Sequence, residues 1–102
     1  MRRGTTPVIT CTIIGADLTG SSVYVTIQQG GVEITVVNPQ IETTDTGCKI
    51  TVILTQEQTL KLFKGIADIQ VRWITSDETA HATDIKQLNV DKILKNGVIS
   101  YE

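Results

Sequence analysis

The 102-residue chain is poor in the residue types that build metal, nucleic-acid and catalytic sites. It contains one histidine, two cysteines, one tryptophan, two tyrosines and one phenylalanine. Its nine Lys and Arg residues are outnumbered by eleven Asp and Glu, which gives a net charge of −2. A nucleic-acid-binding domain needs a basic excess to neutralise phosphates, so we expect no nucleic-acid partner.

Long apolar runs are also missing. No stretch approaches the ~18 apolar residues that a membrane span requires. The chain starts with Met1 and two arginines, and the apolar stretch 8–14 behind them is interrupted by Thr10, Cys11 and Thr12, which makes a poor signal peptide. We therefore expect no membrane partner and a location in the cytoplasm, unless the chain leaves the cell within an assembly.

The two cysteines, Cys11 and Cys48, fall on the apolar phase of predicted strands. We interpret them as buried thiols that behave as small hydrophobic residues. A disulfide between them would require an oxidising compartment, which nothing in the sequence indicates. One histidine, His81, and two distant cysteines form no recognisable zinc site, so we expect neither a metal nor another cofactor.

The abundant residues are β-branched. Val, Ile and Thr supply 40 of the 102 residues, against six Leu and four Ala. Stiff, branched side chains pack well on a pleated surface and favour strands over helices. The length suits one hydrophobic core, so residues 1–102 are expected to form a single all-β domain.

Alternation of apolar and polar residues predicts the individual strands. Gly30 and Gly31 separate two alternating segments and predict a tight hairpin turn, in which glycine supplies positive φ angles. The expected strands cover residues 6–14, 23–29, 32–36, 48–54, 66–75 and 80–90, with short ones at 41–44 and 98–101.

Thr55 and Gln58 match a capping box, which predicts one short helix near residues 56–64. Gly65 is expected to stop this helix, and Leu60 and Phe63 are expected to face the core. One further helical turn is expected at residues 91–95. Because the strands alternate, the prediction is an antiparallel β-sandwich of six to seven strands, with the helix bridging the two sheets. A small barrel is the alternative architecture.

The sequence Asp45-Thr46-Gly47 matches the active-site signature of aspartic proteases, of which the retroviral kind is a β-rich dimer. In those enzymes two aspartates share one proton, because like charges at contact distance cannot both ionise. Here polar residues precede the motif where the proteases have a buried apolar strand. An Asp-x-Gly sequence between strands is also ordinary turn chemistry, which is the favoured interpretation.

Other catalytic patterns are absent from the sequence, so no enzyme is expected. His81 lies beside a predicted turn, and we interpret it as a surface or edge-strand residue rather than a catalytic base. Four acidic residues near one hairpin end have no recognised calcium-loop spacing and are interpreted as a solvated rim. They are Asp68, Asp77, Glu78 and Asp84.

Tyr24 and Trp73 are the candidate contact residues. Trp73 is in phase with Ile69 and Val71, so a core position is the default, and an exposed platform for a sugar ring or partner protein is the alternative. Tyr24 points away from the apolar face of its strand and either covers a second face or marks a contact surface.

Four stretches of the chain match one pattern: residues 1–7 (MRRGTTP), 54–62 (LTQEQTLKL), the hairpin 69–90, and 93–99 (ILKNGVI). With these, the chain resembles a group of small prophage proteins from Gram-positive, Firmicute-type bacteria. That group looks like an immunoglobulin-like sandwich related to the N-terminal domain of upper baseplate proteins, which attach receptor-binding parts to phage tails. The resemblance carries no catalytic residues. One departure is Glu78, which follows Asp77 where the pattern has glycine.

The resemblance implies a non-enzymatic structural or adaptor protein of a phage tail or baseplate that binds other tail proteins. A homo-oligomer is expected, since symmetric assembly is common for such modules. It would reside in the bacterial cytoplasm during assembly and then in the virion, unless it is an assembly factor left behind. A surface-glycan binding module using Trp73 and Tyr24 is the alternative, and a dimeric aspartic protease using Asp45 is a remote one.

Overall fold

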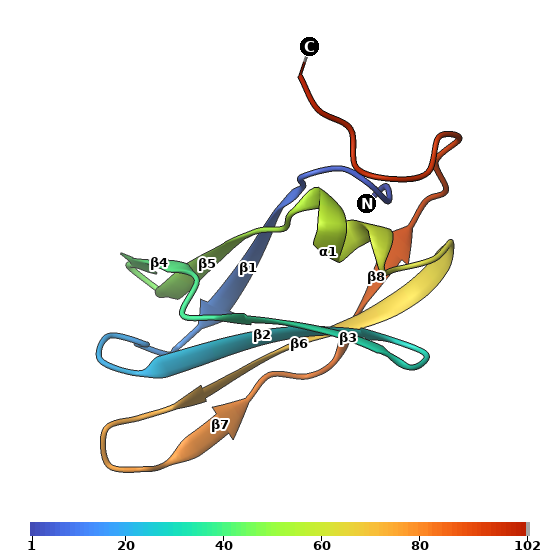
Figure 1. Cartoon of the computed structure of the whole chain (residues 1–102). Coiled ribbons are helices and arrows are strands. Elements are labelled where there is room, and N and C mark those ends of the chain that lie inside the picture. The colour runs from blue at the N-terminus through green and yellow to red at the C-terminus, as the bar shows by residue number, and fades with distance from the viewer. Residues whose placement is uncertain (102) are drawn as a thin grey trace.

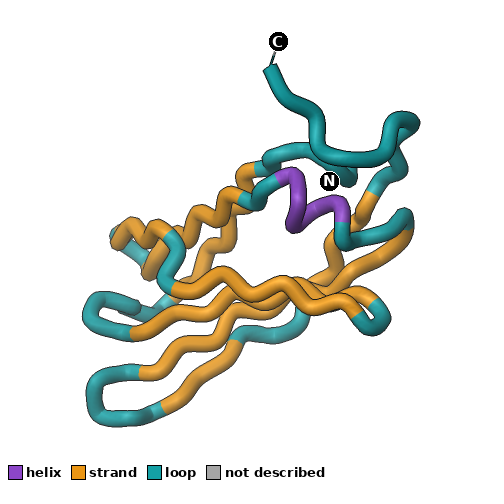
Figure 2. The backbone as a smooth tube through the Cα atoms, viewed as in Figure 1, coloured by secondary structure: helices purple, strands orange, loops and turns teal. Residues whose placement is uncertain are grey.

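The chain folds into two antiparallel β-sheets packed as a sandwich, as the computed structural model of residues 1–101 shows (Figures 1 and 2). One sheet has the order β1-β5-β4, and the other has the order β3-β2-β6-β7, with β8 also paired to β6. The all-β sandwich expected from the sequence is therefore confirmed. The elements are β1 (Val8–Ile14), β2 (Ser22–Gln29), β3 (Val32–Val37), β4 (Gln40–Thr44), β5 (Gly47–Ile53), α1 (Gln56–Leu60), β6 (Gly65–Ile74), β7 (Ala80–Ala82) and β8 (Lys86–Val90).

The core lies between the two sheets and is built by strict alternation along the strands. Every second residue of the three central strands is buried, as the period of two in a pleated strand requires. Each fully buried Val, Leu or Ile stabilises the fold by roughly 1.5–3 kcal/mol. The alternating core residues are Val23, Val25 and Ile27 of β2, Cys48, Ile50 and Val52 of β5, and Ala67, Ile69 and Val71 of β6.

The hairpin between β2 and β3 forms as expected. Gln29 pairs with Val32, which leaves Gly30 and Gly31 as a two-residue loop. Gly30 adopts a φ of 57°, whereas Gly31 is not among the positive-φ residues. A positive φ at the first loop position alone is the pattern of a type II′ turn, one of the two that suit the twist of a hairpin.

The helix begins as expected but ends early. The Thr55 side chain accepts from the Gln58 amide and the Gln58 side chain accepts from the Thr55 amide, which is the predicted capping box. The helix then stops at Leu60 instead of Lys64, and Phe63 is 52% exposed, so its expected core position is wrong. The residues that reach the core from this segment are Thr59 and Leu62, while Leu60 is half-buried.

Distant side chains explain the early end of α1. The Arg3 guanidinium donates to the carbonyls of Leu60 and Leu62, at the helix terminus where carbonyls lack helical partners. The buried side chain of Gln29 then donates to the backbone carbonyl of Phe63 and accepts from its backbone amide. These contacts direct the chain out of the helix and into β6 before another turn can form.

The long return strand expected at residues 80–90 is split into β7 and β8, so residues 1–101 form eight strands instead of six to seven. Thr83 lies at the break, where its hydroxyl accepts from the Val71 amide at 3.1 Å. The side chain of Gln70 donates to the Thr83 carbonyl at 2.8 Å. At this point on the edge of β6, regular strand pairing is replaced by these two bonds, which both go to Thr83.

The C-terminal expectations were wrong. Residues 91–95 contain no helical turn and residues 98–101 form no strand within the described chain. Instead, this part of the chain passes over α1 and projects away from the sandwich (Figure 1). Among the residues described, no helix is both long and apolar enough to cross a membrane.

Candidate functional site: an open groove beside β1

The two sheets have different widths, and this leaves part of the sandwich uncovered. β7 and β8 pair with the same edge of β6 at different heights, so their sheet is four strands wide while the facing sheet is three wide. β1 is an edge strand of the narrower sheet. Between β1 and the β6–β8 side lies an open groove of about 310 Å³. We call this the open groove, and it is lined by residues 9–13 of β1, Ile69, Gln70 and Val71 of β6, Thr83, and Lys86 and Leu88 of β8.

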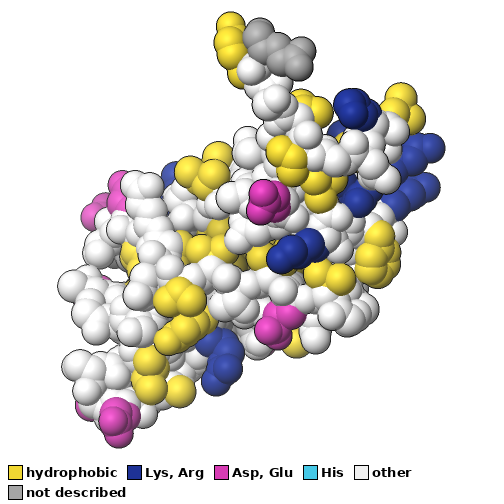
Figure 3. All heavy atoms as spheres, viewed as in Figure 1, with side chains coloured by type: hydrophobic (Ala, Val, Ile, Leu, Met, Phe, Trp, Pro, Cys, Tyr) yellow, Lys and Arg dark blue, Asp and Glu magenta, His cyan; other side chains and the backbone are white. Residues whose placement is uncertain are grey.

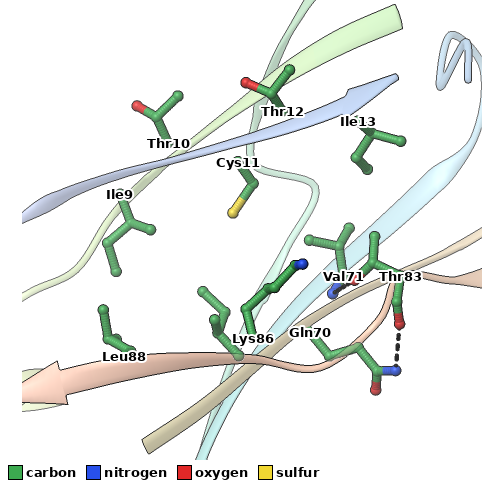
Figure 4. Close-up of a pocket in the computed structure, with 11 residues that line it drawn as sticks. Ile9, Thr10, Cys11, Thr12, Ile13, Gln70, Val71, Thr83, Lys86 and Leu88 are labelled. Atoms are coloured by element: carbon green, nitrogen blue, oxygen red, sulfur yellow. Dashed lines mark hydrogen bonds between the residues drawn. The ribbon is translucent and has the colours of Figure 1, made fainter. Parts of the chain in front are cut away.

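Apolar side chains from both sheets point into the open groove (Figure 4). Ile9, Cys11 and Ile13 extend from β1 into the groove, where Ile9 lies opposite Leu88 of β8, Cys11 lies above Lys86, and Ile13 lies above Val71 of β6. The four side chains of Ile9, Cys11, Ile13 and Leu88 are only partly buried, although they pack against the core. The groove is thus a continuation of the core that lacks the strand needed to cover it.

The free edge of β1 offers backbone hydrogen-bonding groups beside this groove. The Leu54 amide donates to the Pro7 carbonyl at 3.2 Å, and the Gly15 amide donates to the Thr46 carbonyl at 2.7 Å. In an antiparallel pair, residues bonded to one neighbour alternate with residues whose N–H and C=O point to the other side. The odd-numbered residues of β1 therefore bond to β5, and Thr10 and Thr12 direct their peptide groups to the free edge.

Among the described residues that line the open groove, Lys86 is the charged one. Its side chain reaches from β8 into the space below Cys11 (Figure 4). Burial raises the pKa of the Cys11 thiol, so this group stays protonated and acts as an apolar lining residue. The groove thus combines an apolar floor with a single positive charge.

The two cysteines lie near each other without a bond. Cys11 pairs with Ile50 and Cys48 pairs with Ile13, which makes the cysteines diagonal neighbours on one sheet face. Such neighbours have Cα atoms about 7–8 Å apart, too far for a disulfide without backbone movement. Both thiols are free. Cys48 is buried as expected, and its burial, followed by the nearby Asp17, raises its pKa.

The strand register places Tyr24 and Trp73 on opposite faces of one sheet. Trp73 pairs with Val23 and His81 and shares their inner phase, while Tyr24 pairs with Arg72 on the outer face. The Trp73 ring is half-buried and stacks on the His81 ring at a centroid distance of 5.3 Å. Tyr24 is 40% exposed, and a shallow hollow of about 260 Å³ lies beside it.

The Asp45-Thr46-Gly47 sequence occupies the turn between β4 and β5. Thr44 pairs with Gly47, so Asp45 and Thr46 form a two-residue loop, and both are exposed. A Cβ atom at Gly47 would lie 2.0 Å from the Ile13 carbonyl oxygen, which explains why glycine occurs here. The close approach of β1 accounts for the glycine, and Asp45 and Thr46 lie in the turn as expected.

The four acidic residues expected at the solvated rim do not gather into an ion site. Within residues 1–101, no group of His, Cys, Asp or Glu side chains is arranged to hold a metal. Asp77 instead accepts from the Thr75 hydroxyl and the Thr79 amide, and these bonds lower its pKa. Glu78 adopts a φ of 66°, in the left-handed region that favours glycine.

Sequence reasoning missed the open groove, although a signal for it was present. Polar residues interrupt the alternation between 80 and 90, and two of them, Thr83 at the break between β7 and β8 and Lys86 of β8, line the groove. Comparison of the chain with family models, curated proteins and solved structures found no significant match.

Proposed function

We propose that this protein is a non-enzymatic structural or adaptor component of a phage tail or baseplate module, which works through protein–protein contacts. One structural observation supports it above the rest: an unpaired strand edge runs along an open apolar groove. The resemblance to prophage proteins supports the phage setting. In this proposal the chain assembles with tail or baseplate proteins in the bacterial cytoplasm and enters the virion.

The chemistry of the groove favours an extended polypeptide as its occupant. Thr10 and Thr12 present peptide N–H and C=O groups at the free edge, and a partner strand satisfies such groups with main-chain bonds. Its alternate side chains then enter the apolar space between β1 and β8. A small polar ligand would satisfy the edge but leave Ile9, Ile13 and Leu88 exposed to water.

The test is mass spectrometry of purified particles from bacteria that produce the phage, with copy number measured for the native chain and two variants. Thr12→Pro removes an N–H from the free edge and spares every bond to β5, because proline is tolerated where the amide faces solvent. Thr12→Val keeps that N–H and serves as the matched control. We expect the native chain and T12V in a fixed stoichiometry and T12P strongly depleted. A native chain abundant in the lysate and absent from particles would overturn the proposal.

The outer face of the wider sheet favours one second candidate, a binding module for surface glycans. Tyr24 and Arg72 are cross-strand neighbours there and offer an aromatic ring beside a multiple hydrogen-bond donor. Titration of wall polysaccharide against the native chain and Tyr24→Ala would test this by calorimetry. If the native chain gives no heat of binding, the glycan-binding function is ruled out.

A further inference from the structure

We propose that the open groove of one copy receives the C-terminal segment, residues 98–101, of a second copy, so that the protein assembles head to tail. This inference names the first partner of the groove and rests on the proposed function of the groove as a strand-binding site. A contact between two different surfaces of the same chain closes into a ring or extends as a filament.

The C-terminal segment has apolar side chains with no cover of its own. Val98 is 57% and Ile99 is 59% exposed, and Tyr101 is fully exposed. Apolar atoms are visible on the projecting end of the chain in Figure 3. The sequence pattern of the segment predicts a strand, yet the isolated chain forms none. The segment can therefore form a strand when the free edge of another strand is available to pair with it.

One side chain fixes the direction of this segment. The side-chain nitrogen Nε2 of Gln56 donates to the backbone carbonyl of Ile99 at 3.0 Å, and the backbone amide of Ile99 donates to the side-chain oxygen Oε1 of Gln56 at 2.9 Å. Gln56 therefore occupies one edge of the segment as a neighbouring strand would. Because peptide groups alternate between edges, those of Val98 and Ser100 point to the other side, where a β1 strand can bond to them.

The groove and the segment match in length and charge. Five successive residues of β1 line the groove, which is about 16 Å of strand, and four residues of the segment span about 13 Å. Ile99 and Tyr101 share one face of an extended chain and would enter the apolar space. In the sequence, Glu102 directly follows the segment and supplies a carboxylate, whose charge is opposite to that of the Lys86 ammonium in the groove.

Native Cys11 allows a direct test, because it lies inside the groove. We would oxidise the purified full chain mildly and follow reducible dimers and higher oligomers on denaturing gels for Ile99→Cys, with Ser100→Cys as the matched control. The Ile99 bonds to Gln56 use backbone atoms, so I99C preserves them. We expect roughly tenfold more intermolecular disulfide for I99C than for S100C, since successive side chains point to opposite faces. Adding Cys11→Ser should abolish the product.

A second measurement does not depend on new cysteines. Chains lacking residues 97–102 should sediment as monomers at concentrations where the native chain forms oligomers, and their Cys11 should react faster with a maleimide. The buried Cys48 provides the internal reference for an intact fold. Equal cross-linking of I99C and S100C, no cross-linking of either, or identical sedimentation of the native and shortened chains would overturn the inference.

The two proposals fail separately. Depletion of T12P from particles without any cross-link through Cys11 keeps the tail-protein role and removes self-assembly through the C-terminal segment. If I99C forms the cross-link but the native chain is absent from particles, self-assembly through the C-terminal segment is kept and the tail-protein role is removed.

Discussion

The side chain of Gln29 is predicted to be one of the most important polar groups for stability. It is 4% exposed and lies at the end of β2, next to the segment that leaves α1. Its amide nitrogen donates to the Phe63 carbonyl at 2.7 Å, and its carbonyl oxygen accepts from the Phe63 amide at 2.8 Å. The pair ties the crossover between the two sheets to the central strand of the wider one.

Substitution of Gln29 by Ala removes both bonds and leaves the Phe63 peptide groups without partners. Each net bond contributes about 0.5–1.5 kcal/mol, and a buried group left unsatisfied costs about 1–3 kcal/mol. We therefore expect a loss of about 3 kcal/mol in the free energy of unfolding. For a domain of this size that is a fall in Tm of more than about 10 °C.

Urea denaturation followed by circular dichroism measures this loss, with Gln28→Ala as the control. Gln28 is the neighbouring residue with the same chemistry, but its side chain is exposed, so its replacement should change stability by less than about 0.5 kcal/mol. Equal stabilities of Q29A and Q28A would refute the reasoning, because they would show that water replaces the two bonds without cost.

Three further predictions concern turns. Glu78→Gly should raise the free energy of unfolding by about 1 kcal/mol in urea titrations, because residue 78 has a left-handed φ of 66° that only glycine adopts without strain; no gain would argue against strain there. Gly47→Ala should lower stability by more than about 2 kcal/mol in the same assay, since its Cβ would meet the Ile13 oxygen at 2.0 Å, and a wild-type midpoint would disprove that contact. Hydrogen bonds from Thr75 and Thr79 lower the pKa of Asp77 from its ordinary value of 3.8. The ionised carboxylate therefore stabilises the folded state above pH 3.8, and this stabilisation is lost as the pH falls through the lowered pKa of the folded protein. Asp77→Asn should therefore flatten the acid limb of stability against pH, and an unchanged limb would contradict the assignment.

Local chemistry made much of the fold predictable. The β2–β3 hairpin depends on two glycines between alternating segments, and the start of α1 depends on Thr55 and Gln58, three residues apart. In both cases the deciding contacts lie within a few residues, so the sequence pattern contains the whole reason. The core faces of β2, β5 and β6 were predictable because pleated strands bury alternate residues wherever a second sheet covers them.

The errors occurred where contacts join distant parts of the chain. The end of α1 is set by Arg3 and Gln29, which are 57 and 34 residues from their backbone partners in that segment. The break at Thr83 depends on bonds to β6, and the open groove depends on the number of strands in each sheet. None of these has a local signature, because a periodic pattern records which face is apolar and not what lies opposite.

Two glutamine side chains illustrate how this small sandwich treats chain that has no strand partner. Gln29 and Gln56 each bind one backbone residue on both its N–H and its C=O, and each therefore replaces a strand. Gln29 does so in the interior, where it closes the crossover. Gln56 does so at the surface, where the apolar side chains of the bound segment stay exposed.

An anchor at the surface serves a different purpose from an anchor in the core. Holding Ile99 by its backbone restricts the conformations of the segment before any partner arrives, and this lowers the entropy lost on association. Gln56→Ala should therefore weaken head-to-tail assembly without a comparable loss of fold stability. Gln29→Ala should lower the free energy of unfolding without a comparable loss of assembly. Measurement of both variants by sedimentation and by urea denaturation would separate the two roles, and parallel losses in both assays would show that the two glutamines are equivalent.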